Sequence, residues 1–249
     1  MQLPAFRRVA TGRGWSWIAE AFGLFRRNPL IWIALNLVLL LIALALGQIP
    51  VLGSYLIYLL TPLFLAGLMT AARDTERGGE IEIAHLFRGF TENASQLITV
   101  GGVYLVGNVI VAGVAIALGG AELQEVMRAA SEGGVQVEPR VANKAVFAVL
   151  VSAALFVPLA MALWFAPALV MLDRVPALKA LLLSTQACVA NVLPFLLYGI
   201  VMSGLLFAAL LPALLGLVLW VPIAMISAYT GYRDVFPPGA AEPAPAELN

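Results

Sequence analysis

The chain has 249 residues, of which 62% are hydrophobic and 11% charged, and its formal net charge is zero. Soluble domains are roughly 45–50% apolar and about 25% charged, so this chain has too few charged side chains to cover a water-soluble surface. The composition therefore predicts an integral membrane protein and excludes a disordered chain, a disulfide scaffold and a typical nucleic-acid binder. Cys188 is the single cysteine, so no intrachain disulfide can form.

Six stretches without charged residues are long enough to cross the hydrocarbon layer, which takes about 20 apolar residues. We predict spans at Pro29–Gly47, Val51–Ala72, Leu97–Leu118, Ala145–Leu172, Val192–Leu211 and Ala213–Gly231. Pro212 separates the last two, because the uncharged stretch that contains them is too long for one helix. The sequence thus predicts an all-α fold, an integral membrane bundle of six transmembrane helices within a single membrane domain, 1–234.

The basic residues predict the orientation of this bundle. Five arginines precede the first span, and six spans place eleven of the 14 basic residues on that same side. By the positive-inside rule, both the N-terminus and the C-terminus are then cytoplasmic. The proline-rich segment 235–249 cannot form a helix or a strand, so we expect a disordered cytoplasmic tail.

Three cytoplasmic segments have the periodicity of amphipathic helices, and each precedes a pair of spans. Their apolar faces consist in turn of Trp15, Ile18, Phe22 and Phe25, of Ile83, Leu86, Phe87 and Phe90, and of Leu178, Leu181, Leu182 and Val189. Such helices lie at the membrane interface with their arginines near anionic head groups, or they pack on the cytoplasmic ends of the spans. The candidate lipid-interface residues are Trp15, Trp17, Arg26, Arg27 and Arg88.

We interpret this arrangement as a threefold internal repeat, with units at about 14–75, 82–174 and 176–234. The second span of each unit contains a proline, at Pro62, Pro167 and Pro222. The pattern Pro-x7-Thr-x2-Arg-Asp begins at Pro62 and recurs at Pro222. Prolines kink transmembrane helices, so these three residues are candidates either for hinges beside a binding site or for static kinks that shape the bundle.

The predicted spans contain no Asp, Glu, Lys, Arg or His, whereas proton-coupled transporters and voltage sensors place such groups in the membrane. Among their polar residues, we expect Asn36 and Asn108 to form hydrogen bonds between helices, with a substrate contact as the alternative. His85 is expected to be solvated. No nucleotide-binding loop, nucleophile elbow or zinc pattern occurs, so we expect no catalytic, cofactor-binding or metal-binding residue and no enzyme.

Two groups of motifs carry a resemblance to known proteins. The first is Gly14-Trp15-x-Trp17-Ile18-Ala19-Glu20 followed by Leu24-Phe25-Arg26-Arg27-Asn28-Pro29, and the second is Thr61-Pro62-Leu63-Phe64-x2-Gly67-Leu68 followed by His85-Leu86-Phe87-x2-Phe90. On these motifs the chain resembles an uncharacterised family of proteobacterial multi-pass inner-membrane proteins. It is more distantly similar to the membrane domain of some glycerophosphodiester phosphodiesterases. The resemblance implies a six-helix bundle in the bacterial inner membrane and supplies neither a substrate nor the phosphodiesterase activity.

Two functions fit these observations. The first is a non-enzymatic inner-membrane protein that organises lipid or other membrane proteins, which the arginine-bearing amphipathic helices favour. The alternative is a transporter or channel for a neutral or apolar solute or lipid, which the prolines and the repeat favour. The expected partners are membrane lipids, with a second copy of the chain or another membrane protein as further candidates, and we expect no nucleic acid.

Overall fold

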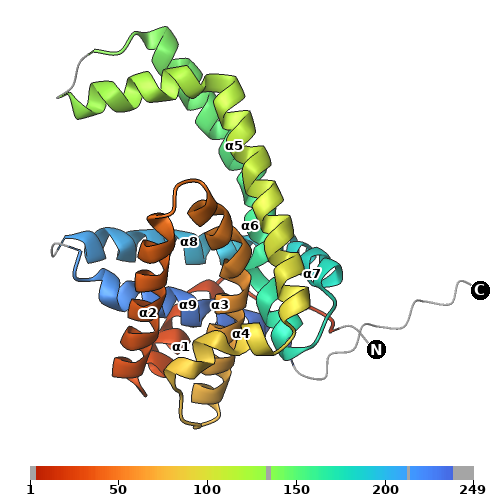
Figure 1. Ribbon diagram of the computed structural model, residues 1–249. Coiled ribbons are helices and arrows are strands. Elements are labelled where there is room, and N and C mark those ends of the chain that lie inside the picture. Colours follow the sequence, from red (N-terminus) through yellow and green to blue (C-terminus); the bar gives the residue numbers. More distant parts are fainter. Residues whose placement is uncertain (1–3, 133–135, 212–213, 238–249) are drawn as a thin grey trace, which may run out of the picture. The chain divides into compact units, whose positions relative to one another are not determined.

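The computed structural model describes residues 4–132, 136–211 and 214–237, and the regular elements in these ranges are helices (Figure 1). They are α1 (Arg13–Phe25), α2 (Pro29–Gly47), α3 (Leu52–Glu76), the 3-10 helix η1 (Ile83–Phe87), α4 (Arg88–Thr91), α5 (Ala94–Ser131), α6 (Pro139–Leu172), α7 (Ala177–Ala190), α8 (Val192–Leu210) and α9 (Leu217–Val235). The all-α class is thereby confirmed. Pro212, Ala213 and most of the expected tail lie outside the described residues.

Five of the described helices are long and apolar enough to cross a membrane, namely α2, α3, α5, α6 and α8. The limits of α2 coincide with the predicted span, because Pro29 suits the first helical turn and the turn Gln48-Ile49-Pro50 follows Gly47. The expected sixth span corresponds to α9, which is not among the five because its C-terminal turn carries Arg233 and Asp234. The structure therefore supports five spans and does not confirm the sixth.

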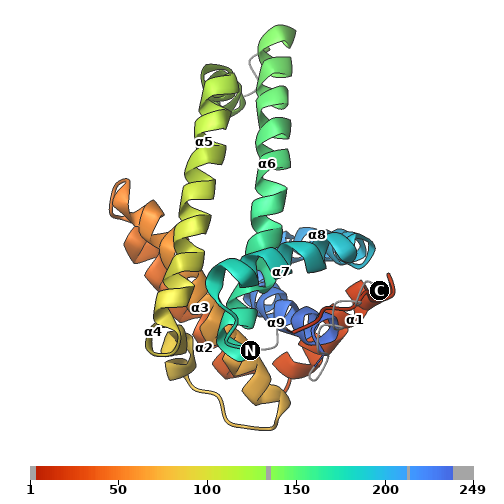
Figure 2. The same cartoon turned by 90° about the vertical axis from the view of Figure 1, so that its right-hand side faces the viewer.

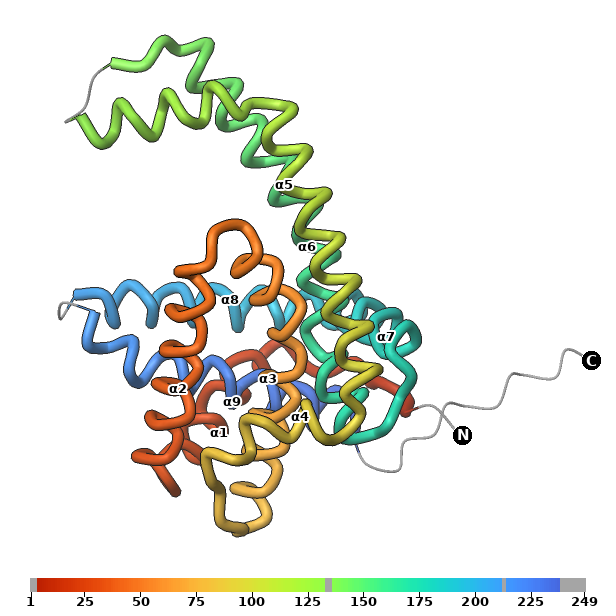
Figure 3. The backbone as a smooth tube through the Cα atoms, in the orientation of Figure 1, coloured from red at the N-terminus to blue at the C-terminus, as the bar shows by residue number. Residues whose placement is uncertain are grey.

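The chain divides into two compact units, one formed by Met1–Gly101 with Met161–Asn249 and the other by Gly102–Ala160. The helices α5 and α6 each run through both units. In the larger unit, Figure 3 traces α2 through a short turn into α3, and α9 packs against both of these helices and against α1. The three-unit repeat and its boundaries stay a prediction.

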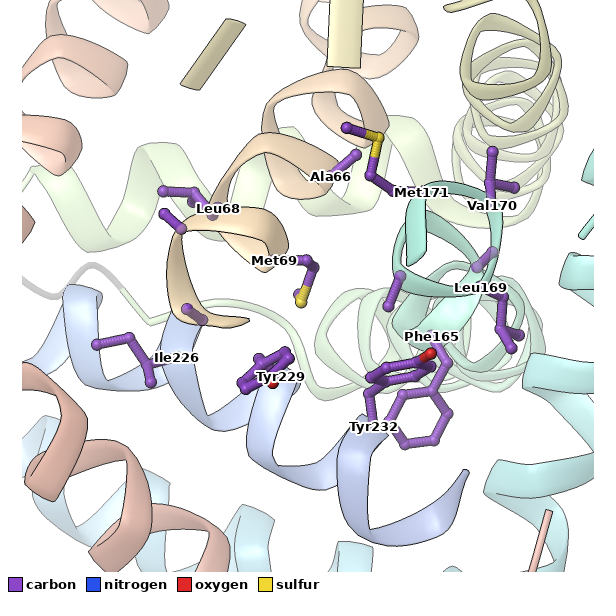
Figure 4. Packing of buried hydrophobic residues seen from close by; sticks show 14 of the residues in the cluster. Ala66, Leu68, Met69, Phe165, Leu169, Val170, Met171, Ile226, Tyr229 and Tyr232 are labelled. Carbon is purple, nitrogen blue, oxygen red and sulfur yellow. The ribbon is translucent and has the colours of Figure 1, made fainter. Parts of the chain in front are cut away.

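The core of the larger unit joins helices that lie far apart in the sequence. Figure 4 shows Met69 of α3 beside Tyr229 of α9. The rings of Tyr232 and Phe165 each contact the ring of Phe236, at centroid distances of 5.7 and 5.6 Å. Trp17 and Phe165 are among the largest fully buried side chains. Since lipid tails are as apolar as these side chains, dispersion contacts and interhelical hydrogen bonds hold such helices together.

The three segments predicted to form amphipathic helices differ from one another. α1 is a helix as expected, although it exposes Trp15 and Phe22. The second segment is not one amphipathic helix, because a capping box between Glu82 and His85 starts the 3-10 helix η1 and a single α-turn follows it. In this arrangement His85 is buried and Ile83 is exposed, so the prediction of one amphipathic helix in this segment is wrong.

The helix α7 forms where the third amphipathic helix is expected, and its packed face differs from the expected one. It exposes Leu178, Leu182 and Val189, three of the four residues of that predicted face. Its buried face includes small residues such as Ala180 and Ser184. Small residues let helix backbones approach closely, so α7 packs largely through them and leaves Leu178 and Leu182 outside.

The smaller unit contains the adjoining parts of α5 and α6, which lie side by side in Figure 2. A Cβ atom on Gly107 would lie 2.5 Å from Leu159 Cδ1, so the two helices are in close contact there. Gly119 has non-helical backbone angles and interrupts α5. Beyond it, Lys144 Nζ lies 2.5 Å from Glu122 Oε1.

Candidate functional site

A network of paired charges joins α1, α3 and α9 in the larger unit. We call it the ion-pair cluster and define it by Arg7, Arg13, Glu20, Glu76, Arg233 and Asp234. Three arginines face three carboxylates, so the cluster is electrically balanced. None of its members is a candidate site residue from the sequence, where Arg233 and Asp234 stand out only as the end of the repeated Pro-x7-Thr-x2-Arg-Asp pattern.

Asp234 is the most buried member of the ion-pair cluster, with a side chain that is 5% exposed. Its Oδ1 accepts a hydrogen bond from Arg7 Nη2 at 2.8 Å, and its Oδ2 accepts bonds from Arg13 Nε at 2.6 Å and Trp17 Nε1 at 2.9 Å. Arg13 and Trp17 are four residues apart on α1, so both reach the same carboxylate from one helix face. The hydrogen bond to Asp234 raises the pKa of Arg13.

The rest of the cluster links α1 to α3. Arg233 of α9 pairs with Glu20 of α1 and with Glu76 of α3. The hydroxyl of Tyr229 donates a hydrogen bond to Glu76 at 2.6 Å. Arg27 Nη1 donates to the Thr75 carbonyl at 3.0 Å. These bonds fix the N-terminal helix against the ends of two helices that are distant in the sequence.

A second polar group lies where α3 meets η1 and α4. Asp74 Oδ2 accepts a hydrogen bond from Arg88 Nη1 at 2.8 Å and lies 3.2 Å from His85 Nε2. His85 is 5% exposed, and its Nδ1 accepts a bond from the Glu82 backbone N–H at 3.0 Å. The expectation of a solvated His85 is therefore wrong, because this histidine is a packed part of the helix cap.

The five candidate lipid-interface residues have different surroundings. Trp15 is 55% exposed, and Arg26 is exposed with its guanidinium 5.8 Å from the Phe22 ring centre. Trp17 is 1% exposed and bonded to Asp234. Arg27 and Arg88 are bonded to α3 as described above. Of the five residues, Trp15, Arg26 and Arg27 are exposed, whereas Trp17 is buried and Arg88 is half-buried.

An apolar cavity of about 760 Å³ lies among α2, α3 and the start of α9. Nearly all of its lining side chains are aliphatic or aromatic, and Asn36 and Thr61 are the polar ones among the described lining residues. The Thr61 hydroxyl donates to the Ile57 carbonyl at 2.6 Å. This volume falls within the range of about 300–1,000 Å³ that is usual for small-molecule sites.

The two candidate asparagines bond within their own helices. Asn36 Nδ2 donates to the Trp32 carbonyl, and Asn108 Nδ2 donates to the Tyr104 carbonyl, each at 2.8 Å. These bonds correct the expectation of interhelical bonds, because the carbonyl four residues earlier lies within reach of each amide. Asn36 Oδ1 is buried and has no hydrogen-bond partner among the described residues.

The three candidate prolines are all buried within helices. Pro62 lies inside α3, Pro167 inside α6 and Pro222 inside α9. Pro222 lines the apolar cavity together with Val218, whose carbonyl cannot receive the usual helical hydrogen bond from a proline. Whether the three kinks are hinges stays a prediction.

Two further titratable groups lie in the larger unit, the half-buried Asp173 and the buried Cys188. Burial raises the pKa of Asp173, which accepts a hydrogen bond from the Tyr232 hydroxyl at 2.5 Å. Cys188 Sγ lies 3.6 Å from the Met161 carbonyl. Over the described part of the chain, no group of three or more His, Cys, Asp or Glu side chains is placed to hold a metal ion.

Five long apolar helices in one chain define the class as a helical, multi-pass transmembrane protein. No protein-family model matches the chain, and no solved structure matches it. A curated protein of Burkholderia thailandensis, named Probable inner membrane protein BTH_II0599, is 31% identical over 261 residues, which cover 96% of each chain. The chain belongs to the family of this probable inner membrane protein and is itself a multi-pass bacterial inner-membrane protein.

Proposed function

We propose that the protein is a non-enzymatic component of the inner membrane that organises lipid or other membrane proteins. The observation that supports this proposal most directly is the exposed side of α1. Trp15 and Phe22 are seven residues apart, which places them on one helix face, and Arg26 lies one turn beyond Phe22. Aromatic side chains beside an arginine are typical of helices that lie in the head-group region.

The ion-pair cluster supports the same role. It holds the opposite face of α1 against α9 through Asp234, so Trp15 and Phe22 keep a fixed orientation. A preorganised surface binds without the entropic cost of ordering a helix. On this proposal the cluster positions a lipid-facing or protein-facing surface, and its charged residues perform no chemistry.

We further propose that α9 is the sixth span and that both termini are cytoplasmic. The segment from Leu217 to Tyr232 carries no charge, and the charges at the end of α9 are compensated by the ion-pair cluster. The excess of basic residues on one side supports this orientation. Reporter fusions after Ser131 and after Pro237 test it. Alkaline phosphatase is expected to be active only after Ser131 and green fluorescent protein only after Pro237, and the reverse pattern contradicts the topology.

The lipid-organising role is tested by neutralising arginines that lie outside the ion-pair cluster. In vesicles of phosphatidylethanolamine and phosphatidylglycerol, the double variant Arg8→Gln/Arg26→Gln is compared with Arg128→Gln, an exposed arginine of the smaller unit. Each basic residue near an anionic surface contributes about 1 kcal/mol, so after screening we expect a roughly fivefold loss of selectivity for spin-labelled phosphatidylglycerol. Unchanged selectivity in a correctly inserted double variant contradicts the proposal.

A transporter or channel for a neutral or apolar solute is the second candidate, which the apolar cavity favours. A flux assay in the same vesicles tests it, and flux no greater than in empty vesicles counts against it. The more distant similarity to the membrane domain of glycerophosphodiester phosphodiesterases stays a prediction and adds no activity to either candidate.

A further inference from the structure

We infer that the apolar cavity is a binding site for one neutral, single-chain lipid with a hydroxyl group, and that Asn36 Oδ1 accepts the hydrogen bond of that hydroxyl. This inference rests on the proposed role in lipid organisation and names a ligand for it. The cavity belongs to the larger unit and lies apart from the arginines that the role invokes.

The shape of the cavity calls for an elongated ligand. Its lining follows α2 from Ile33 to Leu46, a helical rise of about 20 Å. This length exceeds half of the roughly 30 Å hydrocarbon core of a bilayer. A compact solute would fill one end only, whereas an extended hydrocarbon chain would contact the lining along its length.

The chemistry of the lining calls for an uncharged ligand. No charged side chain occurs among the described residues that line the cavity. A charged head group placed there would lose its hydration without gaining a partner. The volume of about 760 Å³ is that of a small-molecule site, so the whole of a two-chain phospholipid is a poor match.

The position of Asn36 calls for a hydrogen-bond donor on the ligand. Its Nδ2 is bonded to the Trp32 carbonyl, while its Oδ1 is buried without a partner among the described residues. The Thr61 hydroxyl donates its proton to Ile57 and so does not serve Asn36. Buried acceptors are rarely left unpaired, and an alcohol supplies the missing donor.

The ligand can reach the cavity from the surrounding bilayer. Leu37 and Leu40 of α2 and Val218 of α9 line the cavity and are also exposed on the surface of the larger unit. In a multi-pass membrane protein, the exposed apolar side of such helices faces lipid. An apolar molecule can therefore enter laterally without crossing water.

The test uses the purified full chain in detergent and two photoreactive probes, a diazirine-bearing hexadecanol and its methyl ether. We expect saturable labelling of peptides from α2, α3 and α9, with the alcohol binding about tenfold more tightly because only the alcohol donates to Asn36. Ala43→Phe places an aromatic ring in the lining and is expected to weaken labelling at these peptides. Ala45→Phe, on the same helix and outside the lining, is the matched control and is expected to label as the wild type. Asn36→Leu is expected to bind both probes equally.

Either of two results would overturn the inference. One is labelling of Ala43→Phe at the wild-type level, and the other is equal affinity of the two probes for the wild-type chain. The spin-label selectivity of Arg8→Gln/Arg26→Gln measures a different surface, so it separates a failure of this site from a failure of the proposed function. Thermal unfolding of each variant shows that it is folded before it is labelled.

Discussion

Replacement of Asp234 is the sharpest test of how the ion-pair cluster holds α1. In Asp234→Asn, the side chain keeps its shape and can still accept the hydrogen bond of Trp17, while both arginines lose a charged partner. In Asp234→Ala, the indole N–H of Trp17 also loses its partner. The two variants therefore separate the charge of the cluster from the hydrogen bond at its centre.

The expected losses in the free energy of unfolding follow from how exposed the partners of Asp234 are. The side chain of Arg7 is 57% exposed and that of Arg13 is 35% exposed, so we expect each ion pair to contribute only about 0.5–1 kcal/mol after solvent screening. Trp17 is 1% exposed, and a buried donor without a partner costs about 1–3 kcal/mol. We thus expect Asp234→Asn to lose about 1–2 kcal/mol and Asp234→Ala about 2–5 kcal/mol.

The buried Cys188 supplies the assay, since a fluorogenic maleimide reacts with it only when the larger unit unfolds. At about 2–4 °C per kcal/mol, Tm falls by about 2–8 °C in Asp234→Asn and by about 4–20 °C in Asp234→Ala. Glu122→Ala removes an exposed ion pair of the smaller unit and serves as the control, with a shift below about 4 °C. A Tm of Asp234→Ala close to that of the wild type, or equal losses in both Asp234 variants, would refute this account of the cluster.

Three further predictions concern the larger unit. A Cβ on Gly14 would lie 2.2 Å from the Pro194 carbonyl oxygen, whereas one on Gly23 meets open space. In the same thermal assay, Gly14→Ala should lower the free energy of unfolding by about 1–3 kcal/mol, and Gly23→Ala should raise it by up to about 1 kcal/mol. Burial raises the pKa of the Cys188 thiol to about 12, so maleimide labelling at neutral pH should be at least about 100-fold slower in mild detergent than in sodium dodecyl sulfate, and equal rates would contradict its burial. Burial also raises the pKa of Asp173, so the contribution of this carboxyl group to the free energy of unfolding becomes less favourable as pH rises through its folded-state pKa. Fluorescence melts should show Asp173→Asn to be more stable than the wild type at pH 7, and the difference should disappear in acid. A difference in Tm that does not change with pH would refute this direction of the pKa shift.

The sequence predicts the helices better than it predicts their partners. The limits of α2 follow from Pro29 at its start and from Gly47 and Pro50 around its end, which are local signals. The bond between Trp17 and Asp234 joins residues 217 positions apart, and no periodicity along the chain indicates it. Trp17 was assigned to the lipid interface with Trp15, and only the packing of α1 on α9 distinguishes the two tryptophans.

Apolar periodicity also leaves the direction of a helix face undetermined in a membrane protein. In water an apolar face turns inward, whereas in lipid it can equally turn outward. Leu178 and Leu182 of α7 show this ambiguity, since both are exposed while the small residues opposite them are packed. The apolar cavity depends on the spacing of three helices, which the sequence does not indicate. The sequence therefore identifies Asn36 as a polar residue in a span, but it does not show that Asn36 lines a cavity with its Oδ1 unpaired among the described residues.

The most direct test of the proposed role is extraction of the tagged protein in native lipid discs at its native expression level, followed by mass spectrometry of all molecules that accompany it. We expect either a lipid enriched over the bulk membrane or a protein partner in stoichiometric amount. We also expect Arg8→Gln/Arg26→Gln to lower the enrichment of anionic lipid. Discs with the composition of the bulk membrane and no accompanying protein would contradict an organising function.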